Sequence, residues 1–262
     1  MTDDTAPGPG PRPGSAITAG GTARALIRAL GVAGAGLAAG VALSLLGLSL
    51  LQVLFGDLGV TTVIVATLVL TQGLAFGGTA LVYVRVRRLP ATFIPINVPS
   101  LRDLGWVVGG YVLAFLAVGA GAVLVSLTGA SPASNRVGEL GVQNPELLLL
   151  LVPLSILLVG PGEELLFRGV VQGVLRQAFG PAIAVVLAAA IFAAIHFVAL
   201  SGGVGARLVT ITILFLPSLV FGTAYERSGN LVVPALIHGI YNATLFAGLY
   251  LAVRMDTVPT PA

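Results

Sequence analysis

The chain has 262 residues, of which 56% are hydrophobic and 9% are charged, and its mean hydropathy is +1.03. So few charged residues cannot cover the apolar interior of a water-soluble globule, whereas a lipid bilayer accepts an apolar exterior. A net charge of +3 in so apolar a chain concerns membrane orientation and does not indicate a nucleic-acid-binding surface. The lack of cysteine in the sequence excludes disulfide scaffolds and thiolate metal sites.

Residues 1–22 consist mainly of Pro, Gly, Ser, Thr and Ala. Such a composition buries too little apolar surface to offset the entropy of ordering, so we predict a disordered N-terminal tail. The apolar run that follows, from about Ala25 to Phe55, is too long for the core of a secretory signal peptide. We interpret it as the first transmembrane helix.

Apolar runs long enough to cross a bilayer recur along the chain. They lie near residues 25–55, 60–84, 104–128, 147–176, 181–200, 207–225 and 231–252. Unbroken runs of this length are typical of helices and not of the short alternating strands of a membrane barrel. We therefore predict an all-α, polytopic transmembrane helix bundle with about seven spans (six to eight). Residues 23–100 would form the first two helices and a connector, and residues 101–254 the remaining core.

Arginines mark one side of the predicted bundle. They precede the first span and surround the connector between the second and third spans, at Arg24, Arg28, Arg85, Arg87, Arg88 and Arg102. Positive charge favours the cytoplasmic side, so we expect a protein of the cytoplasmic membrane with its N-terminus inside and its C-terminus outside. Pro90, Pro95 and Pro99 exclude a continuous helix in the connector, which we expect to lie at the membrane interface.

Charged and ionisable residues inside a span are costly, so each is a candidate for function or for one half of a buried pair. The fourth run contains Glu163, Glu164 and Arg168. The two histidines of the chain, His196 and His238, lie in the fifth and seventh runs. Each group has a structural interpretation, as an ion pair or a hydrogen bond between helices, but their occurrence together favours a catalytic site.

Helical spacing divides these residues into pairs, because residues four apart share one face of a helix. Glu164 and Arg168 are predicted to form an ion pair, which leaves Glu163 pointing elsewhere. Asn242 follows His238 by four residues, so both can face one cavity.

The fifth run repeats this spacing, and Phe192, four residues before His196, can form a wall of the same cavity. At 1.5 Å per residue, Glu163 and His196 lie about 20 and 22 Å from the expected cytoplasmic end, and His238 about 10 Å. These depths are compatible with one site that opens to the cytoplasm.

Three motifs occur in order: Glu-Glu-x-x-x-Arg at 163–168, Phe-x-x-x-His at 192–196 and His-x-x-x-Asn at 238–242. This pattern resembles the CPBP (Abi) family of intramembrane proteases, which includes the type II CAAX prenyl endopeptidases and lysostaphin-resistance-like proteins. The resemblance covers about residues 105–250. It implies an endopeptidase that hydrolyses a peptide bond in a membrane-associated substrate, such as a prenylated CAAX-type protein or peptide.

The resemblance also implies a role for each motif. Glu163 would activate a water molecule with help from His196, and His238 and Asn242 would stabilise the oxyanion. Structural support would come from Glu164, Arg168 and Phe192.

The expected partners are the lipid bilayer and a membrane-embedded or lipid-modified peptide, and not nucleic acid. No cofactor is favoured, although zinc could be held by Glu163, His196 and His238 with water as fourth ligand. A Glu163 bound to zinc could not also act as a free base, so we favour the metal-independent form. One alternative is a non-catalytic scaffold or bacteriocin-immunity protein that keeps the polar cluster for packing. Another is a proton-coupled transporter, which would need an internal repeat that the sequence does not show.

Overall fold

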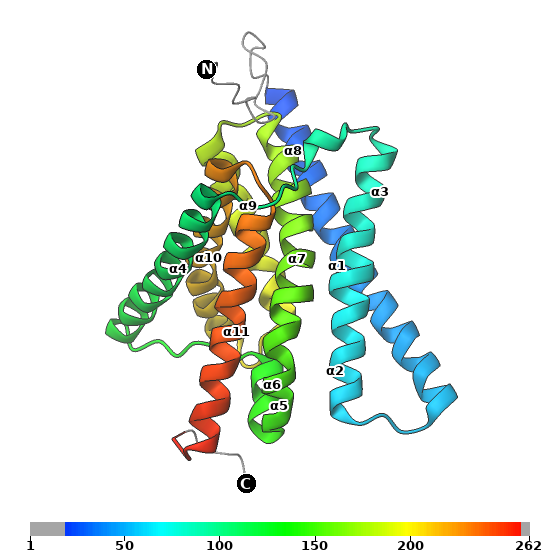
Figure 1. Cartoon of the computed structure of the whole chain (residues 1–262), viewed down its shortest axis with the longest axis vertical. Coiled ribbons are helices and arrows are strands. Elements are labelled where there is room, and N and C mark those ends of the chain that lie inside the picture. The colour runs from blue at the N-terminus through cyan, green and yellow to red at the C-terminus, as the bar shows by residue number, and fades with distance from the viewer. Residues whose placement is uncertain (1–18, 258–262) are drawn as a thin grey trace.

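The computed structural model describes residues 19–257, which form one bundle of helices (Figure 1). Within this range, seven helices are long and apolar enough to cross a membrane. They are Gly20–Phe55, Val60–Val86, Leu101–Leu127, Pro145–Arg176, Pro181–Ala199, Val204–Ser228 and Val232–Arg254. The described residues contain no strand, and a single isolated bridge pairs Asn135 with Leu200. The prediction of an all-α polytopic membrane protein is confirmed.

Helix α1 (Ala19–Phe55) begins earlier than the sequence predicts. Residues 19–22, assigned to the tail by their composition, form its first turn, where Arg24 Nε donates a hydrogen bond to the carbonyl oxygen of Gly20. Adding residues to an existing helix is favourable even when those residues could not start one, which explains the difference. The rest of the predicted tail, residues 1–18, lies outside the described residues.

The second span runs antiparallel to α1 and contains a π-helical segment between two α-helical ones. It consists of α2 (Val60–Leu68), the π-helical segment η1 (Val69–Gly77) and α3 (Gly78–Val86). The connector that follows contains a short turn, η2 (Ala91–Phe93), and its Phe93 is buried against Gly173 of the fourth span. The connector is therefore packed on the fourth span through Phe93, and its place at the membrane interface stays a prediction.

Helix α4 (Leu101–Leu127) forms the third span and begins with a capping box, in which Ser100 and Asp103 satisfy each other's backbone N–H groups. A short helix, α5 (Arg136–Gln143), then leads into the fourth span. That span comprises α6 (Pro145–Leu154), η3 (Ser155–Val159), α7 (Gly160–Glu164), η4 (Leu165–Gln172) and α8 (Gly173–Arg176). Pro153 and Pro161 supply no N–H to the helix, and the π-helical segments η3 and η4 occur around them.

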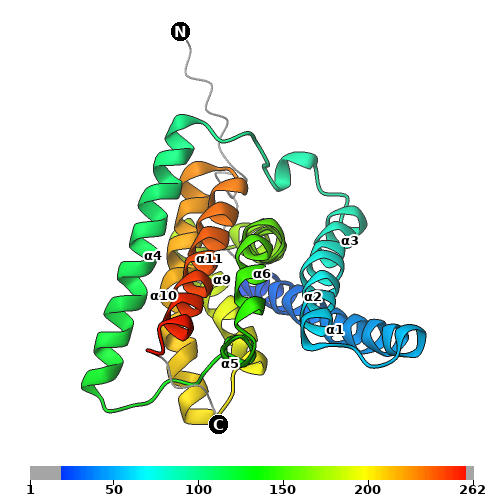
Figure 2. The ribbon, with the colours of Figure 1, turned by 60° about the horizontal axis from the view of Figure 1, so that its bottom comes forward.

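The fifth span is α9 (Pro181–Ile195) with the 3₁₀ turn η5 (His196–Ala199). The last two spans are α10 (Val204–Ser228), which ends at a left-handed Gly229, and α11 (Val232–Arg254). Figure 2 shows the fourth span in the middle of the molecule, between α1–α3 on one side and α4, α10 and α11 on the other. The fourth span can thus contact residues from both of these groups of helices.

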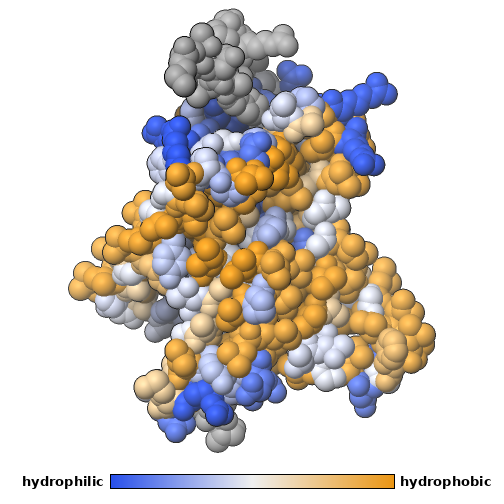
Figure 3. All heavy atoms as spheres, viewed as in Figure 1, coloured by the Kyte–Doolittle hydropathy of each residue, from blue (hydrophilic) through white to orange (hydrophobic). Residues whose placement is uncertain are grey.

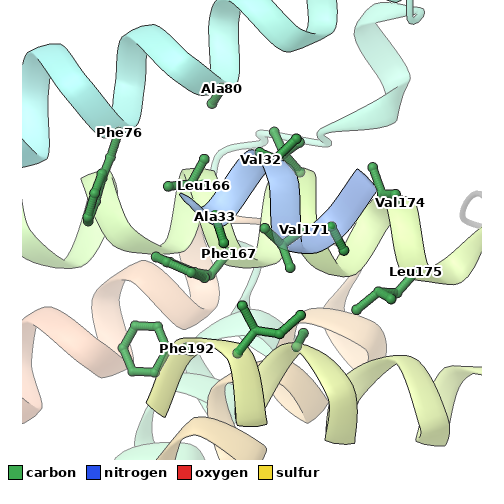
Figure 4. Packing of buried hydrophobic residues seen from close by; sticks show 14 of the residues in the cluster. Val32, Ala33, Phe76, Ala80, Leu166, Phe167, Val171, Val174, Leu175 and Phe192 are labelled. Carbon is green, nitrogen blue, oxygen red and sulfur yellow. The ribbon is translucent and has the colours of Figure 1, made fainter. Parts of the chain in front are cut away.

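The largest hydrophobic cluster joins α1, η1, η4 and α9 (Figure 4). At its centre, the Phe167 ring makes edge contacts with Phe76 at 5.9 Å and with Phe192 at 5.2 Å between centroids. Because aromatic contacts of this kind fix ring positions, Phe192 is anchored to η4 through Phe167, which is itself held against η1 by Phe76. The turn η5, which directly follows the helix of Phe192, begins with His196.

The outer surface is apolar over its middle, and hydrophilic side chains gather toward the two ends of the face in Figure 3. Large hydrophobic side chains remain exposed on the long helices, as a bilayer requires. The end of α11 lies at the end of the bundle opposite to the start of α1 (Figure 1). This placement follows from the odd number of spans.

Candidate active site

Glycines beside the two adjacent glutamates let neighbouring helices approach the fourth span closely. A Cβ atom on Gly160 would lie 2.6 Å from the carbonyl oxygen of Ala235 in α11. One on Gly162 would lie 2.5 Å from the carbonyl oxygen of Gln72 in η1. Only glycine leaves room for such backbone contacts, so the sequence Gly-Pro-Gly brings α11 and η1 directly against the segment with the glutamates.

Glu164 is fully buried and bound through both carboxylate oxygens. Its Oε2 accepts a hydrogen bond from Arg168 Nε at 2.8 Å, and its Oε1 lies 2.9 Å from His238 Nδ1. Arg168, also fully buried, donates through Nη2 to Ser218 Oγ at 2.9 Å. The predicted Glu164–Arg168 ion pair is present, and it connects the fourth span to α10 and α11.

Glu163 is buried as well, and its two carboxylate oxygens have different surroundings. Oε1 accepts a hydrogen bond from Gln72 Nε2 at 2.8 Å. Oε2 has no hydrogen-bond partner and lies 3.9 Å from His196 Nε2 and 3.8 Å from His238 Nε2. The structure therefore brings together the three ionisable residues that the sequence placed on separate helices.

Each imidazole is oriented by a contact at Nδ1. His196 Nδ1 lies 2.8 Å from the carbonyl oxygen of Phe192, and His238 Nδ1 lies 2.9 Å from Glu164 Oε1. A carbonyl and a carboxylate oxygen can only accept, so Nδ1 carries a proton in both rings. Both rings therefore turn their Nε2 atoms toward Glu163.

The gaps of 3.8 and 3.9 Å between Glu163 Oε2 and the two Nε2 atoms are too long for direct hydrogen bonds. They are of the length at which one water molecule can bridge polar groups. A water at this point would meet a carboxylate oxygen and two imidazole nitrogens. This is a suitable environment for removing a proton from water.

Two aromatic rings enclose the imidazoles. The Phe192 ring lies 4.7 Å from that of His196 and 5.7 Å from that of His238, between centroids. Phe221 of α10 stacks on His238 at 4.8 Å with an interplanar angle of 18°. Phe192 thus has the position expected of a wall, and Phe221 is a second wall that the motif spacing did not indicate.

Part of the sequence that forms this site matches a known protein family. Residues 145–244, from the start of α6 into α11, match the family of type II CAAX prenyl endopeptidase Rce1-like proteins. The match covers 100 of the 262 residues, so the similarity to this family is a property of that segment. Comparisons with curated proteins and with solved structures found no match. The Rce1-like segment contains all three motifs, and the family supports a CAAX-type protease fold for this membrane protein.

Asn242 lies inside the Rce1-like segment, one turn after His238 on α11. Its side chain is half-buried, and within residues 19–257 the structure gives it no hydrogen-bond partner. The shared face predicted for His238 and Asn242 is therefore not accompanied by a hydrogen bond between Asn242 and Glu163 or either histidine.

Gln72 lies outside the Rce1-like segment and was not predicted as a site residue. The sequence did contain a signal, because a glutamine in the middle of a transmembrane run is itself unusual. The predicted site was built from charged residues and histidines within the spans and from residues four positions from a histidine, and Gln72 belongs to none of these groups. Ser218, which binds Arg168, was missed for the same reason.

The ligand set proposed for zinc can be tested against the geometry. Among the described residues, no group of three or more His, Asp, Glu or Cys side chains is arranged to hold a metal ion. Glu163, His196 and His238 converge, but as placed they do not form such a group. The Nδ1 contacts of the two histidines are of the type that also supports metal-bound histidines.

Proposed function

We propose that this protein is an intramembrane endopeptidase in which Glu163 activates water for attack on a peptide bond. The observation that carries the proposal is the convergence of Glu163 Oε2 with the Nε2 atoms of His196 and His238, each within 4 Å, inside a membrane helix bundle. The Rce1-like match supports the same reaction class.

In the proposed reaction, a water molecule between these three groups gives a proton to Glu163 while its oxygen attacks the carbonyl carbon of the substrate. A tetrahedral intermediate with a negatively charged oxygen forms. The proton then passes from Glu163 to the amide nitrogen as the C–N bond breaks. The products are a new carboxyl terminus and a free amine.

The charges of the buried cluster support separate roles for the two histidines. Ionised Glu163 and Glu164 carry two negative charges against the single positive charge of Arg168, so one imidazolium would neutralise the cluster. We assign that cation to His238, because Glu164 accepts from its Nδ1 and would stabilise it. Its Nε2–H would then stabilise the oxyanion, while neutral His196 assists the water.

Asn242 would be the second donor to the oxyanion. Its half-buried side chain has no hydrogen-bond partner in the described structure, so its amide is free to donate to a substrate. The substrate would be a membrane-associated protein or peptide, and the family description suggests a prenylated CAAX-type C-terminus. The arginine clusters favour a protein of the cytoplasmic membrane whose site receives substrate from the cytoplasm.

The test is a cleavage assay with the full chain in proteoliposomes and a farnesylated peptide that ends in a CAAX sequence, with products identified by mass spectrometry. We expect the wild type to release the C-terminal tripeptide and Glu163→Gln to be about 10²- to 10⁴-fold slower, the usual contribution of a general base. Glu146→Gln makes the same chemical change at an exposed position of α6 and should leave the rate unchanged.

A non-catalytic scaffold predicts a different result, with no product from any variant and a lower melting temperature for Glu163→Gln. Metal dependence is tested on the same samples by dialysis against a chelator. We expect the rate to survive dialysis. A rate that is lost and then restored by zinc alone would overturn the metal-independent form of the proposal.

A further inference from the structure

Gln72 makes a direct contact with the proposed base from outside the Rce1-like segment. Its side chain is buried in η1, and its Nε2 donates to Glu163 Oε1 at 2.8 Å. A carboxylate only accepts, so the amide nitrogen and not the amide oxygen must face Glu163. The other end of the amide, Gln72 Oε1, is buried and has no hydrogen-bond partner.

The backbone of Gln72 is held firmly in this place. Its carbonyl oxygen lies against Gly162, where even a Cβ atom would come within 2.5 Å. One turn later, Phe76 is buried and packs on Phe167 of η4. The amide of Gln72 is therefore presented to Glu163 from a fixed point on the second span.

This contact determines where the free oxygen of Glu163 points. A carboxylate can rotate about its Cγ–Cδ bond, and rotation would exchange or displace the two oxygens. With Oε1 held by Gln72, Oε2 stays directed at His196 and His238.

We propose that Gln72 is a positioning residue, which orients the Glu163 carboxylate so that Oε2 receives the proton of the attacking water. This inference rests on the proposed function. The amide leaves its own oxygen buried without a partner, a cost that the hydrogen bond to Glu163 must offset. The second span would then be part of the catalytic unit and not only a membrane anchor.

The test is Gln72→Met, which keeps the length of the side chain and removes the donor. In the farnesylated-peptide assay we expect kcat to fall about 10- to 100-fold, the effect of losing one hydrogen bond to a charged group, with KM within about twofold of wild type. If Gln72→Met does not fold, Gln72→Asn keeps the amide but shortens the side chain by one methylene, and we expect the same loss of kcat.

The chain contains a matched control. Gln172 is also a buried glutamine, its Nε2 donates to the carboxylate of Glu226 at 2.9 Å, and its Oε1 likewise has no partner. Gln172→Met therefore makes the same change away from Glu163, and its kcat should equal that of the wild type.

Several results would overturn the inference. They are a wild-type kcat for Gln72→Met, a rise of KM without a fall of kcat, or an equal loss of kcat in Gln172→Met. These differ from failure of the proposed function, in which the wild type and Glu163→Gln would be equally inactive. An active wild type with inactive Glu163→Gln and fully active Gln72→Met would leave the proposed function intact and remove only the role of Gln72.

Discussion

At the scale of single residues, Glu164 does more than neutralise Arg168. The helical spacing predicted the ion pair, but the second oxygen of Glu164 also lies 2.9 Å from His238 Nδ1. Glu163 and Glu164 point in different directions, as adjacent helical residues do, and the His238 ring lies where it can contact both. The His238 ring thus binds Glu164 through Nδ1 and directs Nε2 toward Glu163.

Replacing Glu164 should therefore affect stability strongly. In Glu164→Gln, the fully buried Arg168 loses its anion and His238 loses its charged acceptor. Removing one partner of a buried ion pair costs about 3–5 kcal/mol, and we expect a fall of this size in the free energy of unfolding. Denaturation in detergent, compared with the exposed Glu146→Gln, measures it. Equal stability of the two variants would show that the pair contributes little.

How much of the site could be predicted depends on the kind of residue. Glu163, His196 and His238 were found because ionisable groups are rare in transmembrane spans. Gln72 was not found, since its role depends on a contact between two helices that no spacing within one helix reveals. Phe221 is an ordinary core residue by sequence, and only the packing of α10 on α11 places it against His238.

At the scale of elements, the glycines of α7 set how closely the helices approach. Gly162→Ala would place a Cβ atom 2.5 Å from a backbone carbonyl oxygen of η1, which cannot move aside as a flexible side chain could. We expect a loss of about 1–3 kcal/mol in the free energy of unfolding, together with lower peptidase activity, because η1 must shift away from Glu163. Gly248→Ala in α11 meets no atom within 4 Å and is the control. A Gly162→Ala protein with wild-type activity would contradict the close-contact interpretation.

The span boundaries were predictable to within a few residues because hydropathy determines them, but the π-helical segments and the early start of α1 were not. These features depend on hydrogen bonds along the helix and on packing against neighbours. Hydropathy does not report either of them.

Outside the membrane spans, hydrogen bonds among Ser134, Glu139 and Ser201 hold the segment after η5. This group is called the strap. Glu139 of α5 accepts hydrogen bonds from the hydroxyls of Ser134 and Ser201, and the Ser201 N–H donates to the carbonyl oxygen of Ser134 at 2.9 Å. The Ser134 and Ser201 hydroxyls hold the pKa of Glu139 below its usual value of 4.5.

This pKa gives a prediction for acid conditions. Because the folded-state pKa of Glu139 is lowered, its contribution to the strap is complete above about pH 4.5 and is lost as the pH falls through the lower folded-state pKa. Hydrogen exchange of the Ser201 amide should therefore accelerate in acid, relative to the intrinsic rate. Glu139→Gln should abolish that change. If both proteins show the same pH dependence, Glu139 does not control the strap.

At the scale of the whole molecule, the site is assembled from both halves of the bundle. The Rce1-like segment supplies Glu163, His196 and His238, and the second span adds Gln72. The division into residues 23–100 and 101–254 remains a prediction from the sequence. The contact between Gln72 and Glu163 crosses that boundary.

The most direct measurement compares membrane peptides, by mass spectrometry, from cells that express the wild type, Glu163→Gln or Glu146→Gln at equal levels. We predict cleaved C-terminal or membrane-derived peptides with the wild type and Glu146→Gln, and accumulation of their uncleaved precursors with Glu163→Gln. Identical peptide sets from all three proteins would contradict the claim that Glu163 and the two histidines form a proteolytic site.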